Sequence, residues 1–178
     1  MSLAEDLLAD GEPEKEHHAG IATRQPRKRV AGGALIHDGS GRLLFVIPNY
    51  KPGLEIPGGM AEENESPAAA CRREIREELG LELDIGELLV VDWLPAHGVW
   101  PDGLMFLFNG GVIDSVAAPG IAARDPELDG TVFMHLADAA PRLRPSMMRR
   151  LTTALDALRD GRPRYAEFGR SGLTQPTE

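Results

Sequence analysis

Residues Gly59 to Leu81 read GMAEENESPAAACRREIREELGL, and they contain a clear helical pattern. Four apolar residues recur at intervals of three and four, and so share one helical face: Ala68, Cys71, Ile75 and Leu79. Ser66 is a favourable N-cap, Pro67 suits the first helical position, and Gly80 suits the C-terminal end. The stretch therefore predicts an amphipathic helix with both ends marked.

Three carboxylates occupy this helix away from its apolar face. Glu74, Glu77 and Glu78 stand at positions i, i+3 and i+4, so their side chains are expected within a few ångströms of one another. Like charges at this spacing repel, which indicates a missing cation. Carboxylate oxygens are hard ligands, and the sequence has no His or Cys cluster for zinc, so Mg²⁺ or Mn²⁺ fits best.

The order of residues resembles the signature box of the Nudix family. That box runs Gly, five residues, Glu, seven residues, Arg-Glu, an aliphatic residue, any residue, Glu-Glu, any residue, Gly and an aliphatic residue. All nine constrained positions are matched over 23 residues. The order of strands and the final helix are also similar to that family from about Arg29 to Arg159.

The resemblance implies a role for each matched residue. Glu74, Glu77 and Glu78 would hold the metal ions and the attacking water, while Glu65 and Arg73 would brace the loop and helix. Arg73 also faces Glu77 at i, i+4, which favours an ion pair. Two glycines, Gly58 and Gly59, allow a tight turn that brings a backbone carbonyl toward the metal. Asn64 stands where many family members have glycine, and asparagine tolerates the left-handed backbone.

One candidate lies outside the box. Family members often use a further acidic residue before a late strand, and Glu127 precedes Thr131-Val132-Phe133, with Asp125 and Asp129 as neighbours. A turn-forming acidic loop would look the same, so a catalytic Glu127 and a structural Glu127 both stay open.

The rest of the chain predicts an α+β fold, a mixed α/β/α sandwich. Strands are expected over residues 30–36, 42–47, 88–94, 104–108 with an extension toward 113, and 131–136, with a last helix over 146–159. The first two strands would form a hairpin around the turn at residues 38–41. We divide the chain into an N-terminal extension (1–26), for which partial disorder stays open, a Nudix hydrolase domain (27–160) and a C-terminal tail (161–178).

Composition limits the partners. The formal net charge is −9, which disfavours long nucleic acids. No apolar stretch approaches the roughly 20 residues of a membrane span, and a single cysteine suits a reducing compartment, so a cytoplasmic protein is expected. Two basic clusters, at residues 24–29 and 142–150, suggest solvated charge more than phosphate binding.

Some residues have a plainer interpretation. Cys71 lies on the apolar face and is interpreted as a packed core residue. Phe106 and Phe108 alternate within a strand and are expected in the core more than against a ligand. Trp93 and Trp100 are candidate base-stacking groups.

The predicted function is metal-dependent hydrolysis of a diphosphate linkage in a small nucleotide-like molecule, such as an ADP-ribose-like compound or a nucleoside triphosphate. The alternatives are a nucleotide-sensing regulatory module without catalysis and a non-hydrolytic diphosphate isomerase. No residue identifies the substrate, and a homodimer stays open.

Overall fold

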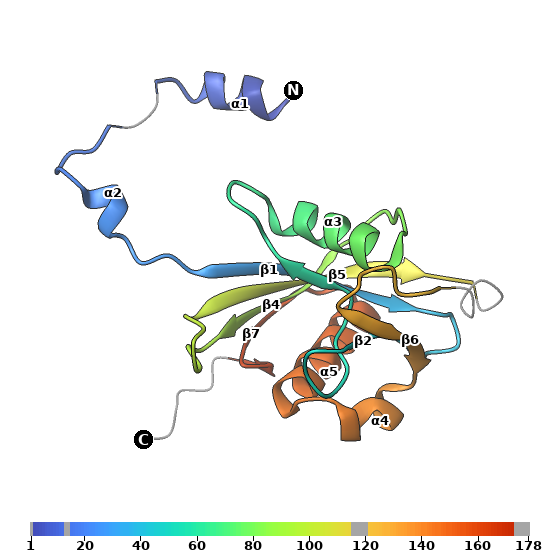
Figure 1. Ribbon diagram of the computed structural model, residues 1–178. Helices are drawn as coiled ribbons and strands as arrows, with labels where there is room; N and C mark the ends of the chain where they lie inside the picture. The colour runs from blue at the N-terminus through green and yellow to red at the C-terminus, as the bar shows by residue number, and fades with distance from the viewer. Residues whose placement is uncertain (1, 13–14, 115–120, 173–178) are drawn as a thin grey trace.

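A mixed β-sheet lies between two helices in the computed structural model, which describes residues 2–12, 15–114 and 121–172 (Figure 1). The elements in chain order are α1 (Leu3–Ala9), α2 (Ile21–Arg24), β1 (Arg29–His37), β2 (Leu43–Pro48), β3 (Gly58–Met60), α3 (Pro67–Leu79), β4 (Leu88–Leu94), β5 (Gly103–Val112), β6 (Leu128–Met134), α4 (Leu136–Ala139), η2 (Ala140–Arg142), α5 (Pro145–Asp160), β7 (Arg164–Glu167) and β8 (Arg170–Ser171). The expected α+β class with a mixed sheet is confirmed.

Strand β1 is central to the sheet, whose order is β6-β2-β1-β5-β4-β7-β8. It pairs in parallel with β5 along most of its length and antiparallel with β3. The predicted hairpin exists only at its turn, where His37 pairs with Leu43. Beyond that pair β2 forms its hydrogen bonds with β6, and β3 pairs with the edge of β1 that β2 leaves open.

Glycines allow β1, β3 and α3 to approach closely. Gly32 pairs with Gly59, and Gly33 pairs with Gly58. A Cβ at Gly32 would lie 2.0 Å from the Pro67 carbonyl oxygen, so the start of α3 rests directly on the β1 backbone. A Cβ at Gly58 would lie 2.3 Å from the Gly32 carbonyl oxygen. These close approaches fix the box helix over the centre of the sheet.

Each face of the sheet has its own apolar core. Residues under α3 include Ala34, Ile36 and Leu44, which pack against Cys71 and Ile75 of the helix. The opposite face packs against α5 and contains Leu35, Phe45 and Leu107 with Leu151. Successive residues of β1 alternate between the two cores, as a strand buried on both faces requires.

The C-terminal residues differ from the tail that we expected. Strand β7 pairs in parallel with β4, and β8 pairs with β7, so the sheet continues to Ser171. The connection depends on Asp92, which accepts hydrogen bonds from Arg150 Nε at 2.6 Å and from the Gly169 N–H at 2.8 Å. A buried carboxylate needs such partners, and these come from α5 and from the β7–β8 turn. Arg150 is therefore a buried structural residue and does not belong to a solvated cluster.

Candidate active site

Helix α3 begins and ends where its capping residues predict. The Ser66 hydroxyl accepts a hydrogen bond from the Ala69 N–H at 3.2 Å, and Pro67 lies in the first turn, where no N–H is needed. Gly80 adopts a φ of 66°, and its N–H donates to the Arg76 carbonyl at 2.8 Å. In the preceding loop Asn64 has a φ of 60°, the left-handed backbone that asparagine tolerates.

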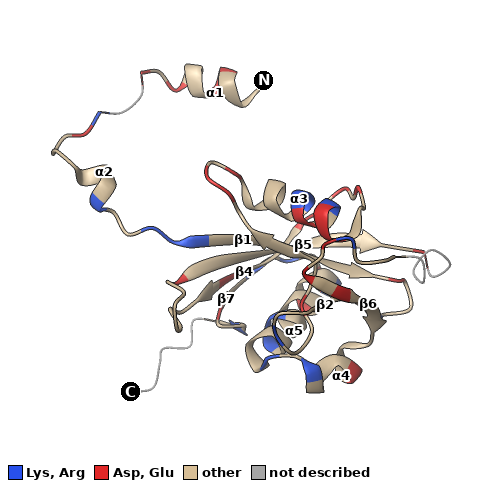
Figure 2. Ribbon diagram, viewed as in Figure 1, with Lys and Arg blue, Asp and Glu red and all other residues tan. Residues whose placement is uncertain are grey.

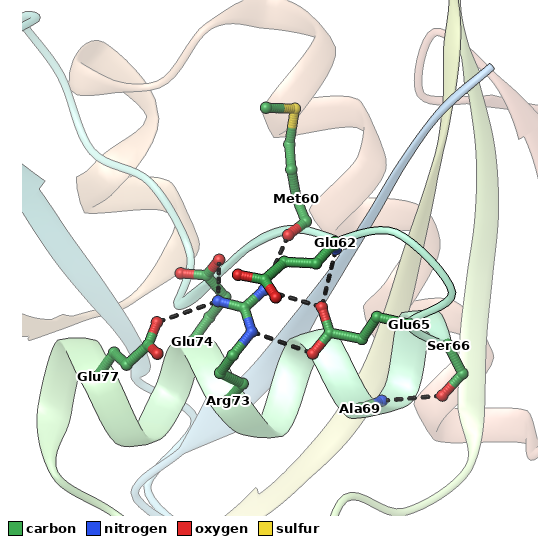
Figure 3. A network of polar contacts seen from close by, with 8 residues as sticks. All are labelled: Met60, Glu62, Glu65, Ser66, Ala69, Arg73, Glu74 and Glu77. Atoms are coloured by element: carbon green, nitrogen blue, oxygen red, sulfur yellow. Dashed lines mark hydrogen bonds and ion pairs between the residues drawn. The ribbon is translucent and has the colours of Figure 1, made fainter. Parts of the chain in front are cut away.

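Arg73 lies at the centre of a polar network that joins α3 to the preceding loop (Figure 3). Its Nε and Nη2 donate to the two Glu65 oxygens at 3.0 and 2.9 Å, and Nη2 also donates to the Met60 carbonyl at 3.0 Å. Nη1 donates to Glu74 at 2.9 Å and to Glu77 at 3.0 Å, so the ion pair expected from helical spacing is present. Hydrogen bonding to Arg73 lowers the pKa of Glu65. One guanidinium thus orients two α3 carboxylates and fixes the loop.

The Glu74 carboxylate lies directly against Gly59. A Cβ on this glycine would lie 2.3 Å from Glu74 Cδ and 2.4 Å from its Oε1. Burial raises the pKa of Glu74, although hydrogen bonds from Arg73 act in the opposite direction. Any side chain at residue 59 would therefore displace this carboxylate.

Glu78 is the most enclosed of the three box carboxylates. Its Oε2 accepts a hydrogen bond from the Gly58 N–H at 2.9 Å, and Gly58 needs its φ of 135° to present that group. The pKa of Glu78 is raised to about 8. Burial is the largest cause, the Gly58 hydrogen bond acts in the opposite direction, and the negative charges of Glu74, Asp125 and Glu55 add to the rise. Within the described residues no Lys or Arg pairs with this carboxylate.

The three carboxylates of α3 divide between two hydrogen-bond donors. Glu74 and Glu77 both turn to Arg73, whereas Glu78 turns to Gly58. In the part of the chain that the structure describes, no three His, Cys, Asp or Glu side chains are grouped so that they could hold a metal ion. Glu74 and Glu77 share one donor, Arg73 Nη1, and Glu78 takes another, the Gly58 N–H. The available oxygens are nevertheless the hard ligands that Mg²⁺ and Mn²⁺ prefer, so the donor set fits such an ion.

The acidic residues nearest to Glu78 outside α3 are not the one we singled out. Glu127 is exposed; its N–H donates to Asp125 Oδ1 at 2.7 Å, and its carbonyl accepts from the Asn49 N–H. Asp125 and Glu55 are the residues whose charges act on Glu78. The Arg124 N–H donates to the Glu78 carbonyl at 2.7 Å, which brings this segment to the end of α3.

The sequence indicates Asp125 only as a neighbour of Glu127, and it does not single out Glu55 as a site residue. A hint existed for Glu55, which stands four residues before Gly59 in Leu54-Glu55-Ile56-Pro57. Glu55 also forms an ion pair with Lys51, with 2.8 Å between Lys51 Nζ and Glu55 Oε1. A catalytic role for Glu127 stays a prediction.

The other candidate residues divide between core and surface. Cys71 is fully buried, and burial raises the pKa of its thiol to about 12, so it is packed as interpreted. Phe108 packs against the core under α3, and Phe106 is half-buried. Trp93 Nε1 donates to Asp102 Oδ2 at 3.3 Å. Trp100 is 52% exposed, with the Arg29 guanidinium 5.2 Å from its ring centroid.

Acidic residues gather around the box helix. Figure 2 shows acidic segments on α3 and on the loop that precedes it, with basic residues interspersed on the helix. No helix among residues 2–12, 15–114 and 121–172 is long and apolar enough to span a membrane.

Comparison with known proteins gives one family and one curated relative. A family model described as the NUDIX domain matches residues 27–155. A MutT-like protein of Streptomyces ambofaciens is 33% identical over 67 residues, which are 38% of this chain and 44% of that protein. The match thus spans less than half the length of the curated relative.

Solved structures show the same fold. A NUDIX hydrolase from Nitrosomonas europaea is 18% identical with a TM-score of 0.61, over 81% of this chain and 80% of that one. A bifunctional NMN adenylyltransferase/ADP ribose pyrophosphatase from Francisella tularensis, in complex with AMP and a manganese ion, is also 18% identical. Its TM-score is 0.62, over 76% of this chain and 43% of that one.

Proposed function

Since this chain belongs to the NUDIX domain family, we propose that it is a metal-dependent hydrolase of a diphosphate linkage in a small nucleoside diphosphate derivative. The substrate classes are ADP-ribose-like compounds and nucleoside triphosphates. One observation carries this proposal: within a complete family box, the Glu78 carboxylate is enclosed beside Gly58 with no Lys or Arg partner in the described residues. A buried carboxylate without a cation is costly, and a bound cation offsets that cost.

The residues proposed to hold the ion are the Gly59 carbonyl and the carboxylates of Glu74, Glu77 and Glu78. When bound, Mg²⁺ or Mn²⁺ supplies positive charge that neutralises the diphosphate oxygens and favours ionisation of water. The similar structure from Francisella tularensis contains a manganese ion, which supports this class of metal. For these carboxylates to bind the ion, Arg73 must release its hydrogen bonds to Glu74 and Glu77. Its two hydrogen bonds to Glu65 then keep the guanidinium in place.

The chain's own groups divide the remaining work. Gly58 orients Glu78 through its N–H, and Arg73 and Glu65 fix the loop that carries Gly59. Glu74 is a suitable proton acceptor because its raised pKa makes it more basic than an exposed glutamate. Glu127 is the other candidate base, and its exposed position favours it less.

We assign this activity to a catalytic domain at residues 27–160, with β7 and β8 attached to its sheet. A cytoplasmic location and a homodimer are further predictions of the sequence. Fractionation of cells and sedimentation of the purified chain test them.

The first experiment is a substrate panel. The purified chain is incubated with ADP-ribose, nucleotide sugars and nucleoside triphosphates in Mg²⁺, in Mn²⁺ and in EDTA, and released nucleoside monophosphate is measured. We expect hydrolysis with either ion and none in EDTA. Full activity in EDTA contradicts metal dependence. Binding without turnover would indicate the regulatory module, and a rearranged product of unchanged mass would indicate the isomerase.

A further inference from the structure

A cavity of about 400 Å³ lies beside the loop that precedes α3, on the part of the sheet that this helix leaves open. Val30, Leu104 and Phe106 form its sheet wall, and Met60 and Pro67 line it from the loop side. The three sheet residues share the α3 face, because Val30 pairs with Leu104, and Phe106 pairs with Gly32, on which α3 rests. The wall is therefore apolar.

Cations line one side of this cavity. Lys28 precedes β1 and Arg29 is its first residue; Figure 2 shows a blue segment where β1 begins, and the rest of the strand is tan. Lys28 pairs with Asp102. The Arg29 Nε donates to the Pro101 carbonyl at 2.7 Å, and within the described residues its Nη groups have no acidic partner. The opposite side is acidic and includes the exposed Glu62. A binding partner that fits this cavity must place apolar groups against its sheet wall and acidic groups beside Lys28 and Arg29.

Helix α1 has that chemistry. Its three leucines fall within one arc of the helix, whereas Glu5 and Asp6 lie on the other side. Leu3, Leu7 and Leu8 are 76%, 61% and 80% exposed. The helix contains no basic residue in its last turn, and its first turn is acidic. In Figure 1 it lies apart from the sheet.

The length of α1 indicates that it needs a partner. It has seven residues, and isolated helices shorter than about 12 residues are marginal in water even with good sequences. The capping box formed by Ser2 and Glu5 satisfies the first N–H groups, but it does not supply packing. Exposed leucines on a helix this short favour docking on an apolar surface.

We propose that α1 docks in this cavity of its own chain. Its leucines contact Leu104 and Phe106, while Glu5 and Asp6 face Lys28 and Arg29 and avoid Glu62. Residues 10–28 connect α1 to β1, and the 15 of them outside α2 span up to roughly 50 Å when extended, so the reach is sufficient. Tethering gives α1 an effective concentration of order millimolar, which favours its own chain over a second copy.

Hydrogen exchange tests the docking directly. In the full chain we expect the α1 amides to exchange at least about tenfold more slowly than in a peptide of residues 1–12, at any protein concentration. The Leu7→Ala, Leu8→Ala variant should lose this protection, although alanine is the better helix former, because it removes the contacts and retains the helix propensity. Protection that survives these substitutions would overturn the proposal.

Cross-linking identifies the docking site. Met60 is 47% exposed at the cavity, and Val112 is 62% exposed at the far end of β5. We expect the Leu8→Cys, Met60→Cys pair to form an intramolecular disulfide and the matched Leu8→Cys, Val112→Cys pair not to form one. Equal yields, or disulfides only between two chains, would contradict docking in the chain's own cavity.

Discussion

The Glu74 carboxylate occupies the space that a side chain at Gly59 would need, with 2.3 Å between Glu74 Cδ and a Cβ built on the glycine. Gly59→Ala should therefore displace Glu74, and we expect turnover to fall by about 100-fold or more. Because the Glu74 side chain can rotate away, the melting temperature should change little. Gly130→Ala in β6 is the matched control, since no atom of the described residues lies within 4 Å of its Cβ position. Steady-state kinetics on both variants decide; an equal loss of activity would sink the explanation.

The second prediction concerns the shape of the Arg73 guanidinium. Arg73→Lys keeps the charge but cannot bond Glu65 twice and also reach Glu74, Glu77 and the Met60 carbonyl. We expect turnover to fall by about 10-fold to 100-fold, as for other residues that orient metal ligands. Arg76→Lys on the same helix, where Arg76 pairs with exposed Glu82, should be near neutral. Equal rates for wild type and Arg73→Lys would show that the network is dispensable.

The third prediction is a pH dependence of stability. Asp38 is buried in the β1–β2 turn; burial raises its pKa, but hydrogen bonds from Ser40 and Arg42 outweigh this and lower the value to about 2. The ionised carboxylate therefore stabilises the fold above pH 3.8, and this contribution is lost as the pH falls toward 2. Urea unfolding between these pH values should show a smaller loss for Asp38→Asn than for wild type, whereas exposed Asp129→Asn should follow wild type. Parallel curves for all three proteins would contradict this assignment.

The fourth prediction tests the buried pair that joins β4 to α5. Arg150→Met leaves the Asp92 charge uncompensated, and we expect a loss of about 3 to 5 kcal/mol in the free energy of unfolding. Adding Asp92→Asn should recover part of this loss, because asparagine is neutral and can still accept the Gly169 N–H. Denaturant titration measures both values. A double variant as unstable as the sum of the two single variants would argue against coupling.

Local signals predicted the box helix almost to the residue. Ser66, Pro67 and Gly80 act within their own turns, so no distant contact is needed to place them. Strand β4 was expected over the residues that it occupies, since six of its seven residues are apolar. Strand β7 was missed because Arg164–Glu167 is short and largely exposed, and only its parallel partner β4 defines it.

The site was predicted in composition but not in geometry. The box singled out Glu74, Glu77 and Glu78, but it does not encode that Arg73 bonds the first two and that the Gly58 N–H bonds the third. Arg150 looked like its basic neighbours in sequence, and only the position of Asp92 across the fold shows that it is buried. Asp125 and Glu55 reach Glu78 from other segments, a proximity that spacing along the chain does not encode.

The most direct test of the site is the Glu78→Gln variant, with Glu82→Gln as control because Glu82 is an exposed glutamate that pairs with Arg76. Burial raises the pKa of Glu78 from 4.5 to about 8, so without metal its ionisation destabilises the fold progressively as the pH rises through that interval. At pH 8 in EDTA, Glu78→Gln should melt higher than wild type by on the order of 5 °C.

The decisive measurement combines melting and turnover on these proteins with Mg²⁺. Wild type should gain melting temperature because the ion binds the folded site, and Glu78→Gln should gain much less. Its diphosphate hydrolysis should fall by about 100-fold or more, while Glu82→Gln keeps both properties. A Glu78→Gln protein that hydrolyses diphosphates at the wild-type rate and gains as much stability from Mg²⁺ would contradict the assignment of this carboxylate to the metal site.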